Sequence, residues 1–130
     1  MGNKYQKQLG MIIDFLKPLT KDLQEGEGIC VHLRDYCHLH INGGIGAEVK
    51  VANTNPQLKY YRYWHEYTEW SIYDDGTVSQ YFHPIRDLDD YYAEPLVLEW
   101  KRYKELILSK HAEIIAERLE KERKLAEFEI

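Results

Sequence analysis

The chain has 130 residues, of which 44% are hydrophobic and 30% are charged, and its formal net charge is −5. These values predict one soluble domain with a single core. The acidic balance argues against direct nucleic-acid binding, which needs a basic stripe, and no apolar run approaches the roughly 20 residues of a membrane span. The N-terminal residues lack the features of a secretory signal, so we expect a cytoplasmic protein whose cysteines stay reduced.

Residues 3–25 carry the pattern of an amphipathic helix. Apolar side chains recur at alternating steps of four and three residues, which places them on one face: Tyr5, Leu9, Ile12, Leu16, Leu19 and Leu23. Pro18 interrupts the pattern without shifting the stripe, so we expect a kink or a short second helix there. The stripe is interpreted as packing against the sheet or the C-terminal helix, and a self-dimerising seam is the alternative.

Residues 28–46 predict a β-hairpin that ends in a glycine-rich turn. Apolar residues alternate with polar ones on both strands: Ile29, Val31 and Leu33, then Leu39 and Ile41. A three-residue connection at 35–37 pairs Leu33 with Leu39 and keeps the apolar side chains together. Cys37 is then expected in the turn.

This register also decides which polar side chains meet across the hairpin. It places His32 opposite His40 and Arg34 opposite His38, on the face that also carries Cys30. A two-residue connection would set histidines opposite apolar residues, and we reject it because it mixes the two faces.

An antiparallel meander is expected to continue to residue 83. Ile45 is expected opposite Ile41, at the start of a third strand. The inner face of that strand consists of alternate apolar residues: Ile45, Ala47, Val49 and Val51. Aromatic and β-branched content predicts further strands over 58–64, 68–73 and 77–82. The sheet is therefore expected to have five or six strands.

Residues 95–126 predict a long C-terminal helix. Pro95 is favoured as its first residue, because proline pushes the preceding Glu94 out of the helical region. Such a helix is roughly 45 Å long at 1.5 Å per residue, which exceeds the width of a small domain. Its last third is mostly charged, so we expect it to protrude or to pair with another molecule, for example in a homodimer.

The hairpin carries the residues best suited to bind a metal. His32 and His40 face each other in the expected register, and Cys30 and His38 are candidate third ligands, with Cys37 or His65 as a fourth: nitrogen and sulfur donors of this kind suit Zn²⁺. The spacing matches no zinc-finger rule. The alternatives are a solvent-facing polar strand surface and a cluster that titrates near neutral pH.

The aromatic segment from Tyr60 to Tyr81 predicts a second candidate surface. Alternation places Arg62 and Trp64 on one face and Tyr61 and Tyr63 on the other, so one set is exposed or covered by a helix. Exposed Tyr, Trp and Arg side chains are typical of protein-binding surfaces. Base stacking on a nucleic acid is the weaker interpretation, because the chain is acidic.

An acidic connector joins the sheet to the last helix and extends the candidate partner-binding set: Asp87, Asp89 and Asp90. It is suited to a basic groove, although such runs are more often solvated. No nucleophile elbow and no phosphate-binding loop are present. A metal-dependent hydrolase acting through the histidines is the only enzyme interpretation that we keep.

In format the chain resembles the small anti-CRISPR proteins that phages use against bacterial defence. The resemblance rests on size, acidity, the tyrosine-rich meander and a charged C-terminal helix ending in KERKLAEFEI. It implies a protein without enzymatic activity that blocks a nucleic-acid-binding nuclease in the host cytoplasm. It also implies that the aromatic face and the acidic connector make the contact.

Together these patterns predict a single α+β domain over residues 1–130, with a helix over 3–25, an antiparallel sheet over 29–83 and a helix over 95–126. The first functional hypothesis is a non-catalytic inhibitor or adaptor that binds a protein. The second is a zinc-binding module centred on residues 30–40, in which the metal is structural or serves a hydrolase.

Overall fold

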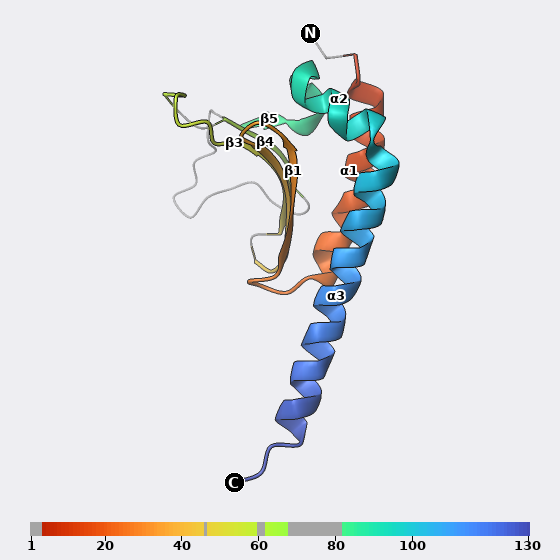
Figure 1. Ribbon diagram of the computed structural model, residues 1–130, viewed down its shortest axis with the longest axis vertical. Helices are drawn as coiled ribbons and strands as arrows, with labels where there is room; N and C mark the ends of the chain where they lie inside the picture. Colours follow the sequence, from red (N-terminus) through yellow and green to blue (C-terminus); the bar gives the residue numbers. More distant parts are fainter. Residues whose placement is uncertain (1–3, 46, 60–61, 68–81) are drawn as a thin grey trace.

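The computed structural model describes residues 4–45, 47–59, 62–67 and 82–130. It has the expected α+β architecture, with an N-terminal helix α1 (Gln6–Asp22), an antiparallel sheet and a C-terminal helix α3 (Trp100–Ala126). The helices lie on one side of the sheet, and α3 continues well past its end (Figure 1).

Within the described residues, the antiparallel part of the sheet has four strands in sequential order: β1 (Gly28–Arg34), β2 (Cys37–Asn42), β3 (Glu48–Asn53) and β4 (Arg62–Tyr67). A short β5 (Phe82–Pro84) pairs parallel to β4, so the expectation of five or six antiparallel strands was wrong. The fourth strand begins four residues later than the predicted 58–64. The strand predicted over 68–73, and all but the end of 77–82, fall outside the described residues.

Helix α1 forms where the apolar stripe predicts it and buries that stripe against the sheet. Leu9, Ile13 and Leu16 are fully buried. The helix continues through Pro18 as one element, so a second helix does not form there. The hydroxyl of Thr20 donates to the carbonyl of Lys17 at 2.7 Å near its C-terminal end.

The hairpin register differs from the predicted one. His32 lies opposite His38, and Cys30 lies opposite His40, so the predicted pairing of His32 with His40 was wrong. The reason is an irregularity between His32 and Arg34, which leaves Leu33 without a partner in the ladder. One extra residue on one strand restores the alternation of faces that a two-residue turn would otherwise destroy.

That extra residue allows the tighter turn that the alternation argument had rejected. The turn consists of Asp35 and Tyr36, and Asp35 adopts a positive φ of 53°. Asp tolerates this region better than most residues. Cys37 therefore lies within β2, opposite Arg34, and its side chain is fully buried instead of standing in the turn.

The third strand is shorter than predicted. Val49 lies opposite Ile41 and Val51 opposite Leu39, whereas Ile45 precedes the strand and is 74% exposed. The connection packs tightly against the chain that follows α1. A Cβ on Gly43 would lie 2.4 Å from Leu23 Cβ, and Gly44 has a φ of +82°, so both positions require glycine.

The C-terminal helical region begins earlier than Pro95. Helix α2 (Asp90–Leu98) contains Pro95 in its interior, and a break at Glu99 separates it from α3. Proline has no N–H to donate to the carbonyl four residues earlier, which belongs to Tyr91. The Arg34 guanidinium donates to that carbonyl at 3.0 Å, so β1 supplies the hydrogen bond that the helix lacks.

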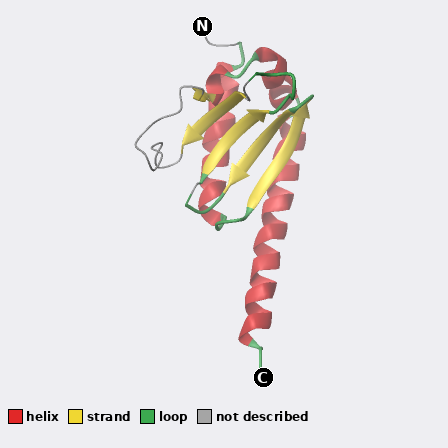
Figure 2. Ribbon diagram, turned by 90° about the vertical axis from the view of Figure 1, so that its left-hand side faces the viewer, coloured by secondary structure: helices red, strands yellow, loops and turns green. Residues whose placement is uncertain are grey.

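Helix α3 packs on the domain only along its first part. Tyr103 and Ile107 are buried, and the last long-range contact is the bidentate pairing of Arg118 with Glu27, whose closest approach is 2.5 Å. All residues from Leu119 onward are exposed, and this end projects beyond the sheet (Figure 2). Among the described residues, no helix is both long and apolar enough to cross a membrane.

Candidate functional site

The open face of the sheet, on the side opposite the helices, carries four of the predicted site residues. Cys30 and His32 come from β1, and His38 and His40 come from β2. The ring centroids of His32 and His38 lie 4.9 Å apart. Cys30 Sγ lies 3.9 Å from His38 Nδ1 and 4.0 Å from His40 Nε2. The structure therefore brings the four side chains together, with Cys30 between two imidazoles.

The environment of these imidazoles favours their neutral form. Burial lowers the pKa of His38, and the charge of His32 adds to this effect. Burial also lowers the pKa of His40, helped by the charges of Lys50 and His38 and opposed by Glu48. Neutral imidazole is the form that binds metal ions.

The spacing of the same side chains is wider than a bound metal needs. Tetrahedral Zn²⁺, with bonds of about 2.3 Å to sulfur and 2.0–2.1 Å to nitrogen, requires sulfur–nitrogen separations of about 3.5 Å. Within the part of the chain that the structure describes, no three His, Cys, Asp or Glu side chains form a group arranged to hold a metal ion. Binding would therefore require Cys30, His38 and His40 to close around the ion.

Cys37 is unsuited to join them. It is fully buried on the helix-covered face, and burial, with the charges of Asp89 and Asp35, raises the pKa of its thiol to about 12. A protonated buried thiol is inert as a nucleophile and as a metal ligand.

A second polar cluster on the open face was not identified from the sequence. His65 Nδ1 lies 2.9 Å from Glu48 Oε2, and Lys50 Nζ lies 3.5 Å from Glu48 Oε1. Burial raises the pKa of Glu48, but the hydrogen bond and charge of His65, together with Lys50, outweigh it and lower that pKa overall. The pairing of Lys50 with His65 across β3 and β4 depends on register. Spacing along the chain therefore carried no signal for it.

The aromatic candidates are divided between the two faces of β4. Trp64 is only 3% exposed and belongs to the core, so it is not part of a contact surface. Tyr63 is half-buried on the open face, and Lys50 Nζ lies 5.5 Å from the centroid of its ring. Arg62 is exposed and lies 3.8 Å from Asp89. Tyr61 falls outside the described residues.

The acidic candidates are exposed but have partners within the chain. Asp87 accepts a hydrogen bond from the Gln6 side chain at 3.1 Å, and Asp90 accepts one from the Lys4 backbone at 3.3 Å. Asp89 precedes α2 and pairs with Arg62. These contacts tie the start of α2 to α1 and β4, which gives the connector a structural role.

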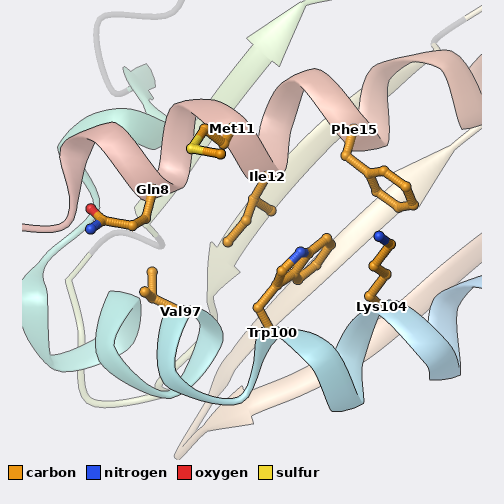
Figure 3. Close-up of a pocket in the computed structure, with 7 residues that line it drawn as sticks. All are labelled: Gln8, Met11, Ile12, Phe15, Val97, Trp100 and Lys104. Atoms are coloured by element: carbon orange, nitrogen blue, oxygen red, sulfur yellow. The ribbon is translucent and has the colours of Figure 1, made fainter.

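A groove between α1 and the α2–α3 junction has a volume of about 310 Å³, and its lining side chains are drawn in Figure 3. It is lined by Gln8, Met11, Ile12, Phe15, Val97, Trp100 and Lys104. The rings of Phe15 and Trp100 meet edge to face at 5.6 Å, and Lys104 Nζ lies 4.8 Å from the Phe15 ring centroid. We call this the α1–α3 groove.

A second groove lies on the other side of α3, beside the edge strand of the sheet, and has a volume of about 400 Å³. Its walls are residues 30–33 of β1 and five residues of the α3 region: Glu99, Arg102, Tyr103, Leu106 and Lys110. We call this the β1–α3 groove. Neither groove was predicted, because each depends on how α3 docks.

Comparison with known proteins adds no further assignment. The chain matches no protein-family model, no curated protein and no solved structure at a significant level. The functional argument therefore rests on the sites described above.

Proposed function

We propose that this protein is a non-catalytic adaptor or inhibitor that binds another protein through the α1–α3 groove. The observation that carries the proposal is the lining of that groove. It combines Met11, Phe15 and Trp100, which are residue types enriched at the centres of protein interfaces. Among the described residues that line it, none carries a carboxylate, imidazole, thiol or hydroxyl group.

The size of the apolar surface favours a protein over a small ligand. Met11, at the rim, is 65% exposed, so apolar surface reaches the open edge of the groove. The groove itself is at the lower limit for small-molecule sites, about 300 Å³. Lys104 at one end favours an apolar anchor side chain with a carboxylate nearby.

The first partner to test is a CRISPR effector nuclease, because the chain resembles anti-CRISPR proteins in format. A net charge of −5 is complementary to the basic surface of a nucleic-acid-binding enzyme. The proposal concerns binding to the enzyme and includes no contact with its nucleic acid.

The test is capture of the purified nuclease by wild-type protein and by Met11→Glu, which places a charge at the groove rim. We expect the variant to lose binding while it keeps its unfolding midpoint. Leu119→Glu is the matched control, because Leu119 is 58% exposed on the projecting end of α3. Equal binding by the wild type and Met11→Glu would remove the α1–α3 groove as the site.

A second candidate function is metal binding by Cys30, His38 and His40. The supporting observation is the placement of Cys30 Sγ within 4.0 Å of nitrogen atoms on both imidazoles. Elemental analysis of tag-free protein, followed by zinc titration of the wild type and Cys30→Ser, tests it. Stoichiometric zinc that the variant loses supports the candidate, and metal-free protein with no measurable affinity rejects it.

A further inference from the structure

Among the described residues, β1 is the outer strand of the sheet, because the strand order begins with it and β2 is its single neighbour. An antiparallel edge strand points every second residue's N–H and C=O away from the sheet. The structure identifies which residues these are. The Cys30 carbonyl accepts a hydrogen bond from Lys110 Nζ at 3.3 Å, so it points outward to α3. By the two-residue period, His32 presents its backbone groups to the same side.

The space beside this edge is a groove with two chemically different walls. On one wall are residues 30–33 of β1. On the other are Tyr103, which is buried, Leu106, which is 37% exposed, and Lys110, with Arg102 paired to Glu99 at 3.2 Å. The groove therefore offers backbone hydrogen bonds, an apolar floor and a cation within one concave surface.

We propose that the β1–α3 groove binds an extended segment of a partner protein, which adds to the sheet as a strand beside β1. Only an extended chain can pair with the outward N–H and C=O groups of Cys30 and His32. This interaction is independent of the α1–α3 groove, which lies on the opposite side of α3. An adaptor with both surfaces has room for two different partners or for two parts of one partner.

Side-chain alternation specifies the class of segment. Residues of the added strand that lie opposite Val31 and Leu33 face the helices, so apolar side chains there contact Leu106. The alternate residues face the open side of the sheet and are polar. When the added strand donates to the Cys30 carbonyl, the Lys110 ammonium loses that acceptor. Lys110 belongs to α3, on the helix side, so a carboxylate at one helix-facing position of the segment replaces that acceptor. The favoured ligand therefore carries one acidic residue among the apolar residues on its helix-facing side, and polar residues on the other side.

The experiment uses three synthetic octapeptides, titrated into the full chain and followed by backbone amide NMR. All three alternate valine with threonine. In the first, one central valine is replaced by glutamate; in the second, the same valine is replaced by lysine; the third is the first with proline in place of every threonine. We expect the glutamate peptide to shift the amides of Cys30 and His32 and to bind about fivefold more tightly than the lysine peptide. The proline peptide lacks the N–H groups for pairing and should not bind.

A charge reversal makes the test specific to this groove. Lys110→Glu should invert the preference, so that the lysine peptide binds more tightly, and Lys124→Glu on the projecting end of α3 should leave it unchanged. Three results would overturn the proposal. The peptides could leave the amides of Cys30 and His32 unshifted, or shift only amides of the α1–α3 groove. Alternatively, these two amides could be protected without peptide while sedimentation equilibrium shows that the chain self-associates. The last would assign the edge to a second copy of the chain. Loss of nuclease capture by Met11→Glu has no bearing on these outcomes, so the two proposals fail separately.

Discussion

The two faces of the sheet are built from the same strands, yet they have opposite tolerance for change. The face under the helices consists of apolar side chains that are almost completely buried, such as Leu39 and Val49. The open face alternates with it and carries His38 and Lys50, which are partly exposed. Burial makes the covered face the source of stability, and the open face and the sheet edge remain accessible for binding. The following predictions test this division.

Leu39→Ala should have the largest effect. Leu39 is fully buried in β2, between β1 and β3, so its truncation removes apolar contacts and leaves a cavity. We expect the free energy of unfolding to fall by about 2–5 kcal/mol. Urea unfolding measures this change, and a loss below 1 kcal/mol would show that the covered face is not the main core.

Cys37→Ser should have the next largest effect. The serine hydroxyl would occupy a fully buried apolar site, and the free energy of unfolding should fall by about 1–3 kcal/mol. Cys30→Ser is the matched control on the open face and should change it by no more than about 0.5 kcal/mol. Equal losses in the two variants would contradict the assignment of the cysteines to different faces.

Acid should weaken the attachment of α3 to the covered side. The Arg118 hydrogen bonds, with that from the Gln24 backbone, lower the pKa of Glu27 from 4.5 to about 2. A carboxyl with a lowered folded-state pKa contributes stability above pH 4.5 and loses that contribution as the pH falls toward 2. Glu27→Gln should therefore reduce the fall of the thermal midpoint over this range.

Glu129→Gln provides the comparison for this measurement, because Glu129 is exposed near the end of the chain. Thermal unfolding at a series of pH values measures the midpoint for each protein. An unchanged pH dependence in Glu27→Gln would mean that the pairing with Arg118 does not stabilise the fold.

His38→Ala should have the smallest effect. The side chain lies on the open face, beside His32 and Cys30, and is not part of the packed core. In metal-free buffer with a chelator, we expect the free energy of unfolding to change by about 0.5 kcal/mol or less. A loss comparable to that of Leu39→Ala would mean that the two faces are energetically equivalent.

Local patterns in the sequence were sufficient for several features. The spacing of Leu9, Ile12 and Leu16 predicted α1, and strict alternation placed Cys30 and His40 on one polar face. These predictions succeed because a helix and a strand each impose a fixed period on the side chains that can be buried together.

The arrangement of the candidate sites was less predictable. The register of the hairpin depends on one unpaired residue, Leu33, and alternation alone cannot show where such a residue is inserted. The interior position of Pro95 was also missed, because the Arg34 guanidinium, distant in sequence, satisfies the free carbonyl of Tyr91.

The sequence by itself determined the α+β class, the two terminal helices and the division of β1 and β2 into an apolar and a polar face. Periodic burial decides these features, and periodicity is local. Only the tertiary structure decided that Cys30 lies between His38 and His40, that Trp64 is buried and that α3 forms a groove on each side. These features depend on which segments dock against one another, and docking is set by packing and charge contacts between residues far apart in the chain.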